Sequence, residues 1–416
     1  MTNLENPLPV NSGTLFQVGS ITKTVTATAA LRLAELGKLE LDAPLRTYLP
    51  ELRLADEGVA RAVTLRHIFT HTGGWLGDCF DDPGPGDDAL ERIVLRLEYL
   101  PQLTPLGEVW SYCNAGFYLA GRAIEVVTGQ TYEAAVSDLV LAPIGLRRSF
   151  YFAEDAITYR VAAGHRAVYD KAGTPEVARP WGLARAVNPA GGLVSSVDDM
   201  LTYARLHLSN GEARQSGPGV RLLQPATTTQ MQAPLVEAAN GEWMGLTWFI
   251  SEIDGVRLLR HGGTTHGQTA TLWLAPARGF GLVVLTNSDR GSELHQEAVR
   301  WALKHYLRLT PRDPEPRQLG EDEVAPYLGR YSAVLDDVEL YRRAGELYLR
   351  KEPKGGFPVP GTPAPPAPPP VRAAFCGPDQ ITLLDEPMQG TRGEFLRDTG
   401  GRLVWLRIGG RIHRKA

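Results

Sequence analysis

A serine and a lysine three residues apart stand at the start of a long helical pattern near the beginning of the chain. Ser20 and Lys23 would share one helix face, because positions i and i+3 are neighbours on a helix surface. A serine hydroxyl is a weak nucleophile, and a lysine can act as its base once desolvation or nearby cations lower the lysine pKa. The pair therefore predicts acyl transfer through a serine nucleophile, although an isolated S-x-x-K pattern is also common on protein surfaces.

The element that must position this pair is a helix over residues 20–36, in which apolar residues recur at helical spacing. Ser20 then lies at the helix N-terminus, where unpaired backbone N–H groups and the helix dipole favour negative charge. The tetrahedral intermediate of acyl transfer carries such a charge on its oxyanion. The position of Ser20 therefore agrees with the chemistry that its spacing to Lys23 predicts.

Two further motifs follow in the chain. Tyr112 and Asn114 form a Y-x-N pattern just before a predicted helix over residues 116–127, and His261 and Gly263 form an H-x-G pattern at the end of a predicted strand. A lone tyrosine is more often a core residue, and a lone asparagine is more often a helix cap. The patterns occur together and in order with S-x-x-K, however, and such context is what makes a short motif specific.

The ordered motifs resemble those of the serine β-lactamase and penicillin-binding-protein superfamily, whose members carry S-x-x-K, Y-x-N or S-x-N, and K-T-G or H-x-G. The tyrosine of the second motif is similar to that of the class C branch, which includes esterase, D-aminopeptidase and amidase relatives. The resemblance covers about residues 10–310. It implies a serine hydrolase that works through an acyl-enzyme.

The resemblance also implies a role for each motif residue. Ser20 would attack a carbonyl, and Lys23 and Tyr112 would share the work of the base in one coupled network. Asn114 would hydrogen-bond both Lys23 and the substrate amide. The backbone N–H groups of Ser20 and Thr264 would form the oxyanion hole. Which of Lys23 and Tyr112 is the formal base stays open.

The third motif, His261-Gly262-Gly263, would bind and support the substrate, but it departs from K-T-G at its first two positions. A lysine is a cation that can bind a carboxylate, whereas a histidine is mostly neutral near pH 7. Esterases, D-amino-acid peptidases and amidases of this superfamily often carry the histidine form, so the resemblance implies small esters, amides or short peptides, including D-amino-acid peptides, as substrates. The alternatives are a true β-lactamase or D,D-carboxypeptidase, and a non-catalytic binding protein on the same scaffold.

A second H-x-G pattern begins at His71. It precedes Tyr112 and follows a predicted helix, whereas the third motif is expected on a strand that flanks the cleft, so His261 is preferred. His67 and His71 are four residues apart, which is typical of a zinc helix. Ile68 stands where the H-E-x-x-H pattern needs glutamate, and the sequence predicts no metal and no cofactor.

The segment of residues 77–88 holds five aspartates among glycines and prolines. Clustered carboxylates can bind calcium, but the EF-hand spacing is absent. We therefore expect a solvated loop here.

The fold class predicted from the pattern is α/β (α+β), with an antiparallel sheet flanked by helices and a helical lobe. From residue 243 the apolar period shifts from helical to two. Short connections between strands favour antiparallel pairing, and the predicted strands cover residues 245–250, 256–262, 269–274 and 281–287. A helix over 294–309 should follow, with its buried stripe formed by Ala298, Trp301, Ala302 and Tyr306.

The chain is expected to form two domains. Residues 1–310 would be the hydrolase domain, and residues 311–322, with three prolines, would be a linker. Residues 323–416 show short alternating strands and predict a small antiparallel, barrel-like β domain, similar to the lipocalin-like domains that follow some of these hydrolases. Residues 357–370 hold eight prolines among fourteen residues and predict an exposed loop.

The net charge, the apolar runs and the cysteine count limit which binding partners and cell compartment are expected. A net charge of −4 gives no electrostatic reason to expect nucleic acid or an anionic membrane, and no apolar run reaches the ~18 residues of a bilayer span. The polar start lacks the features of a signal peptide, and the odd count of three cysteines fits a reducing compartment. We expect a cytoplasmic enzyme with a small-molecule or short-peptide substrate, unless a segment upstream of Met1 carries a signal peptide, and the sequence does not predict the oligomeric state.

The resemblance carries one further expectation. Related enzymes place a helix and two strands before S-x-x-K, and those strands complete a five-stranded antiparallel sheet. Only nineteen residues precede Ser20 here. We therefore expect that the chain starts late and that the strand over residues 281–287 lacks a neighbour on one side.

Overall fold

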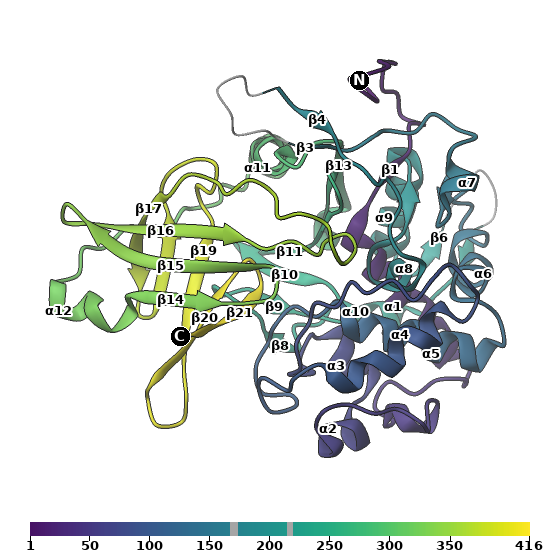
Figure 1. Ribbon diagram of the computed structural model, residues 1–416. Helices are drawn as coiled ribbons and strands as arrows, with labels where there is room; N and C mark the ends of the chain where they lie inside the picture. The colour runs from purple at the N-terminus through teal and green to yellow at the C-terminus, as the bar shows by residue number, and fades with distance from the viewer. Residues whose placement is uncertain (167–173, 214–218) are drawn as a thin grey trace. The chain divides into compact units, whose positions relative to one another are not determined.

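The computed structural model describes residues 1–166, 174–213 and 219–416. These residues form two compact units, which Figure 1 shows as a mixed helix and sheet unit and a β unit. The first unit comprises Met1–Glu237 and Trp243–Thr310, and the second comprises Ala238–Glu242 and Pro311–Ala416.

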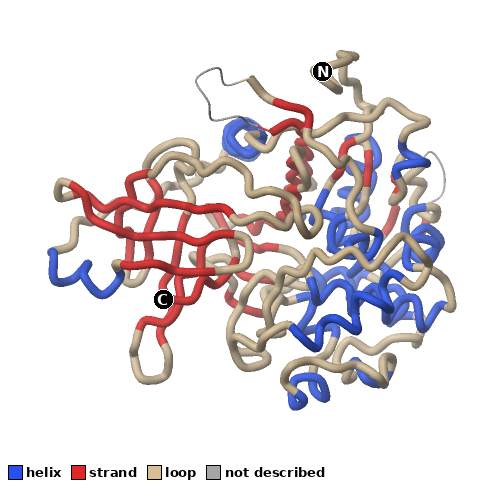
Figure 2. Tube along the Cα trace, in the orientation of Figure 1, coloured by secondary structure: helices blue, strands red, loops and turns tan. Residues whose placement is uncertain are grey.

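The first unit is organised around a six-stranded sheet in which every pair is antiparallel. Figure 2 draws the strands in red and the helices in blue. In spatial order the strands are β13 (Phe280–Thr286), β12 (Thr269–Ala275), β11 (Val256–Thr264), β10 (Phe249–Ile253), β9 (Trp243–Met244) and β8 (Val236–Glu237). Each strand pairs with its neighbour in the chain, as short connections require. The predicted antiparallel sheet is therefore confirmed.

The predicted strand over residues 245–250 begins too early, because β10 begins at Phe249. Gly245 to Trp248 form a turn between β9 and β10, and Gly245 N donates to the Trp248 carbonyl at 2.8 Å. Thr247 sits in the left-handed region with φ of 71°. A β-branched residue rarely adopts that conformation, so composition alone did not signal this turn.

Helices cover both faces of the sheet. The helix α9 (Val197–Leu208) packs on the face that exposes Gly281, and α11 (Gly291–Ala302) with the π-helical turn Leu303–Leu307 packs on the other. The buried residues of α11 and its extension are Gly291, His295, Val299, Ala302 and Leu303. Trp301 and Tyr306, predicted to be buried, are 57% and 60% exposed. The prediction failed because Val299 and Leu303, a branched pair at i and i+4, face the sheet instead.

The strand β13 lies at the edge of the sheet. It pairs with β12 on one side, and no strand among the described residues pairs with its other side. All seven of its residues are partly exposed. An apolar edge with unpaired backbone groups favours association with further strands.

The helical lobe is built around α1 (Thr22–Glu35), a helix buried on almost every side. The hydroxyl groups of its buried threonines form hydrogen bonds inside the core. Thr28 Oγ1, for example, donates to the Thr24 carbonyl at 2.8 Å. The other helices of the unit are α2 (Glu57–Ala62), α3 (Leu65–Phe69), α4 (Ala89–Arg96), α5 (Ala115–Thr128), α6 (Tyr132–Val136), α7 (Ala153–Ala156), α8 (Asn188–Gly191) and α10 (Pro225–Met231). Short strand pairs join β1 (Phe16–Gln17) and β2 (Ser149–Phe150) to β5 (Val194–Ser195), β3 (His165–Arg166) to β4 (Glu176–Val177), and β6 (Glu212–Ala213) to β7 (Val220–Arg221).

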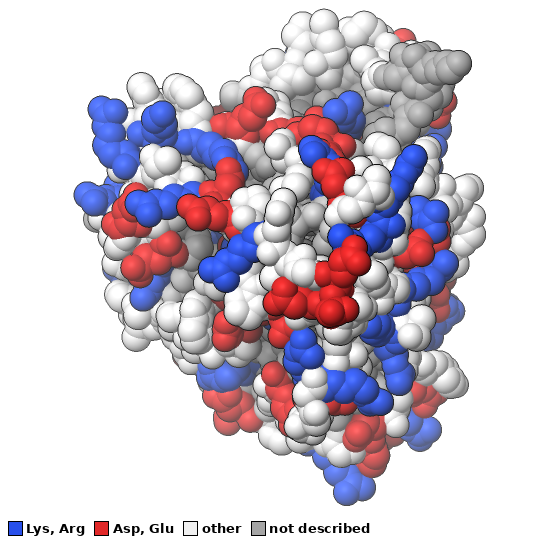
Figure 3. All heavy atoms as spheres, turned by 90° about the vertical axis from the view of Figure 1, so that its left-hand side faces the viewer, with Lys and Arg blue, Asp and Glu red and all other residues white. Residues whose placement is uncertain are grey.

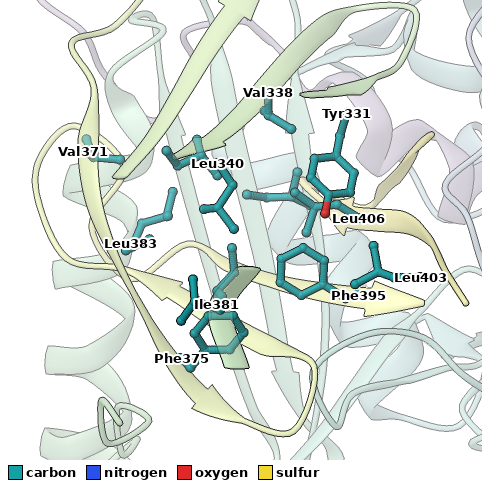
Figure 4. Packing of buried hydrophobic residues seen from close by; sticks show 14 residues of the cluster. Tyr331, Val338, Leu340, Val371, Phe375, Ile381, Leu383, Phe395, Leu403 and Leu406 are labelled. Carbon is teal, nitrogen blue, oxygen red and sulfur yellow. The ribbon is translucent and has the colours of Figure 1, made fainter. Parts of the chain in front are cut away.

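The second unit is a closed eight-stranded barrel, as predicted, with a short helix α12 (Glu321–Val324) before it. Its strands are β14 (Gly329–Ser332), β15 (Asp336–Arg343), β16 (Glu346–Pro353), β17 (Val371–Gly377), β18 (Gln380–Leu383), β19 (Arg392–Arg397), β20 (Leu403–Ile408) and β21 (Arg411–Lys415). Closure occurs where β14 pairs with β21. Apolar side chains fill the interior, among them Tyr331, Phe375 and Phe395 (Figure 4), so the barrel has a packed core.

The proline-rich segment lies between β16 and β17 and forms no regular element. Basic and acidic side chains are interspersed on the face that Figure 3 shows, without a large patch of one sign. Within the described part of the chain, no helix is both long enough and apolar enough to cross a bilayer.

Candidate active site

Ser20 lies in a 3-10 turn, Gly19–Ile21, directly before α1. The turn is held in place because Val18 N donates to the Leu193 carbonyl at 3.0 Å. Gly19 adopts a left-handed φ of 52°, which a side chain would make costly. The turn leaves Ser20 partly exposed at the end of a buried helix, and this exposure suits a nucleophile.

The amine of Lys23 meets Ser20 as the spacing predicted. Lys23 is fully buried, and its Nζ donates to Ser20 Oγ at 3.1 Å, Asn114 Oδ1 at 2.6 Å and the Ala190 carbonyl at 2.5 Å. Three acceptors match the three N–H donors of an ammonium. A neutral amine would keep two of these bonds and turn its lone pair towards Ser20 Oγ. The geometry can therefore hold the lysine in either proton state.

Asn114 and Asp78 extend this network. Asn114 stands at the N-cap of α5 but makes no side-chain cap bond. Its Nδ2 donates to Asp78 Oδ1 at 2.6 Å, and this contact orients the amide so that its oxygen faces Lys23. Asp78 is buried, so the prediction of a solvated loop was wrong for this aspartate. Composition could not show it, because Asp78 is one of five aspartates and only the fold selects it.

The strand β11 runs against the Ser20 turn. A Cβ added at Gly263 would lie 1.9 Å from the Val18 carbonyl oxygen, and one added at Gly19 would lie 2.7 Å from Thr264 N. Only glycines allow such a close approach of two backbones. The backbone of β11 at Gly263 and Thr264 therefore lies directly against the turn that holds Ser20.

His261 points to the helical lobe from the same face of β11 as Gly263, because alternate residues share a face. It is buried, and its Nδ1 donates to the Gly262 carbonyl at 2.6 Å. Burial, together with the nearby charge of Lys23, lowers the pKa of His261 to about 3. The side chain is therefore a neutral imidazole near pH 7.

A closed ring of aromatic contacts surrounds the second motif. Tyr112 stacks on His71 at 4.4 Å between ring centroids and lies 6.3 Å from His261. Phe249 contacts His261 at 5.6 Å and Trp110 at 5.7 Å, and Trp110 in turn lies 6.2 Å from His71. The Lys23 ammonium lies 4.9 Å from the centre of the Tyr112 ring. These contacts fix the tyrosine beside the lysine.

The structure thus joins Ser20, Lys23 and Asn114 by hydrogen bonds. The rings of Tyr112 and His261 pack beside this network. Gly262 contributes its carbonyl to His261, and Gly263 and Thr264 lie against the Ser20 turn. Sequence reasoning missed the contacts of Asp78, of the Ala190 carbonyl and of His71. Within residues 1–166, 174–213 and 219–416, no group of three or more potential ligands could hold a metal ion.

The buried neutral His261 predicts a pH dependence of stability. The unfolded chain binds a proton on this histidine below about pH 6.5, whereas the folded chain does not until about pH 3. The free energy of unfolding should therefore be highest above pH 6.5 and should fall as the pH decreases, by ~2 kcal/mol between about pH 7 and pH 5 through this residue. Urea unfolding of the wild type and of His261→Gln at both pH values checks this. An equal loss in both proteins would contradict it.

Comparisons with known proteins identify the family of this chain. The Beta-lactamase family model matches residues 1–306. Penicillin-binding protein 4 from Amycolatopsis lactamdurans is 33% identical over 332 residues, which cover 77% of this chain and 85% of that protein. Esterase EstB from Burkholderia gladioli is 39% identical over 154 residues, or 33% of this chain and 39% of the esterase. The crystal structure of SurE, at 24% identity, has a TM-score of 0.75 and covers 100% of this chain and 91% of SurE, which shows a shared fold.

The family match spans the three motifs, and the match to the penicillin-binding protein covers most of both chains. The resemblance inferred from S-x-x-K, Y-x-N and H-x-G is therefore confirmed. The chain belongs to the Beta-lactamase family and is an enzyme of its serine hydrolase superfamily.

Proposed function

We propose that this enzyme hydrolyses small esters, amides or short peptides through an acyl-enzyme on Ser20. The observation that carries the proposal is the contact of 3.1 Å between Lys23 Nζ and Ser20 Oγ, where a partly exposed 3-10 turn leads into a buried helix. A nucleophile and a base within hydrogen-bond reach, with the base oriented by further groups, form the arrangement that covalent catalysis requires.

In the acylation step, Ser20 Oγ attacks the substrate carbonyl carbon and its proton passes to the network of Lys23 and Tyr112. The carbonyl oxygen becomes an oxyanion, which the backbone N–H groups of Ser20 and Thr264 stabilise. As the tetrahedral intermediate collapses, the bond to the leaving group breaks, and the network returns the proton to the leaving alcohol or amine.

In the deacylation step, water attacks the acyl carbon and gives its proton to the same network. The bond to Ser20 Oγ breaks, the acid product leaves, and the serine recovers its proton. Asn114 supports both steps, because its oxygen accepts from Lys23 while Asp78 holds its amide group. Water is the only co-reactant.

The substrate class follows from the third motif. His261 is buried and neutral near pH 7, so it lacks the charge with which a lysine would bind the carboxylate of a penicillin. The similarity to esterase EstB supports an ester substrate. The similarity to penicillin-binding protein 4 makes recognition of a β-lactam the alternative to be tested.

A substrate screen tests the proposal. Purified enzyme is assayed with p-nitrophenyl esters, with D- and L-aminoacyl p-nitroanilides and with nitrocefin. The best ester or anilide should exceed nitrocefin in kcat/KM by at least about tenfold, which corresponds to ~1.4 kcal/mol of transition-state binding. A higher kcat/KM for nitrocefin would overturn the proposed substrate class. Failure of a fluorophosphonate to label the protein would overturn the acyl-enzyme itself.

A further inference from the structure

His71, the histidine of the H-x-G pattern that comes first in the chain, hydrogen-bonds the backbone on both sides of Tyr112. Its carbonyl accepts from Ser111 N at 3.0 Å, and its Nδ1 accepts from Cys113 N at 3.0 Å. Ser111 and Cys113 are the residues on either side of Tyr112. The imidazole ring also stacks on the Tyr112 ring, with 4.4 Å between centroids and 24° between planes.

The proton state of His71 follows from these contacts. Nδ1 accepts a hydrogen bond from a backbone N–H, so it cannot itself carry a proton, and the ring is a neutral imidazole protonated on Nε2. The side chain is 1% exposed. An uncharged flat ring can stack closely on the tyrosine without adding a second cation beside Lys23.

The backbone of His71 is unusual. The helix α3 ends at Phe69, and His71 adopts a left-handed φ of 57°, so His67 and His71 do not share a helix face. Non-glycine residues in this region cost energy and persist where surrounding contacts hold them. Here His71 N donates to the Ile68 carbonyl at 3.1 Å and Thr72 N donates to the His67 carbonyl at 2.9 Å. These bonds fix the backbone of His71 to the end of α3.

We propose that His71 is a positioning residue for Tyr112, holding the backbone of the tyrosine motif by two hydrogen bonds and the tyrosine ring by stacking. This inference rests on the proposed function, in which Tyr112 takes part in proton transfer to and from Ser20. A tyrosine side chain can rotate about two bonds, and a displacement of about 1 Å at a catalytic group can cost ~10²-fold in rate. His71 restricts that rotation without touching the substrate.

The chain offers a substitution that separates the ring from the backbone contacts. His71→Asn keeps an acceptor atom near the place of Nδ1, and asparagine tolerates the left-handed conformation better than most residues. It removes the stacked ring. We expect kcat for the best ester to fall ~10- to 100-fold, with KM changed by less than about threefold, because the substrate itself is not contacted.

A double-mutant cycle distinguishes positioning from a general structural role. In a Tyr112→Phe background, whose tyrosine hydroxyl is absent, His71→Asn should change kcat by less than about twofold. The matched control is His207→Asn, which removes another histidine that is 1% exposed, in α9, packed on Tyr203 and Trp248. The control should lower the unfolding midpoint at least as much as His71→Asn and leave kcat within about twofold.

Each outcome decides the inference. Unchanged kcat in His71→Asn, or an equal loss in the wild-type and the Tyr112→Phe backgrounds, would overturn it while leaving the serine mechanism intact. An unchanged kcat in Tyr112→Phe alone would overturn the proposed role of Tyr112 and this inference with it. If His71→Asn does not fold, His71→Phe replaces it in the same cycle, since phenylalanine keeps an aromatic ring but removes the acceptor atom. We expect kcat to fall at least about fivefold when Tyr112 is present and to stay unchanged in the Tyr112→Phe background.

Discussion

Ser20→Ala should abolish covalent labelling by a fluorophosphonate and should lower kcat for the best ester by at least ~10⁴-fold. The substitution removes one oxygen atom from a partly exposed turn, so the fold should be preserved. Lys23 keeps its acceptors on Asn114 and Ala190 in this variant. The loss would therefore report the missing nucleophile alone.

Intact-mass spectrometry after incubation with the fluorophosphonate measures the first effect, and steady-state kinetics measure the second. Ser209→Ala, at the exposed C-terminal end of α9, is the matched control and should label fully. Turnover by Ser20→Ala at the wild-type rate would exclude the serine mechanism.

Lys23→Met should lower kcat by about 10³-fold, the usual range for loss of a general base. Methionine has nearly the length of lysine and fills the same buried space without a charge. Lys23 is fully buried and packs against the Tyr112 and Phe117 rings, so a methionine at this position keeps apolar neighbours. The chemical step should therefore be lost while packing is kept.

Stability separates the two effects in this variant. Removing the ammonium leaves Asn114 Oδ1 and the Ala190 carbonyl without one donor, which costs ~1–3 kcal/mol for each group, but it also removes the desolvation cost of a buried charge. We expect the unfolding free energy to change by less than ~3 kcal/mol, measured with urea. Lys38→Met, at an exposed position after α1, is the control. A kcat within tenfold of the wild type would show that Lys23 is not the base.

The sequence by itself determined what depends on local geometry and on motif order. Ser20 and Lys23 meet because the 3-10 turn that holds Ser20 runs directly into α1, and helical geometry brings positions i and i+3 together. The antiparallel sheet followed from a period of two with short connections. The barrel followed from a run of short alternating strands, although only pairing of β14 with β21 closes it.

The tertiary structure decided what depends on which residues meet across long stretches of chain. Asp78 was one acid among five until the fold placed it against Asn114. Trp301 and Tyr306 had the right spacing for burial, but the choice of the helix face depends on the sheet that packs against it. His71 belongs to an H-x-G pattern that precedes Tyr112 in the chain, so the motif order assigned it no role. Its contacts with residues 111–113 arise only because the chain after α3 packs beside the segment before α5. Spacing along the chain fixes contacts within one element, whereas contacts between elements depend on packing, which no single stretch of sequence encodes.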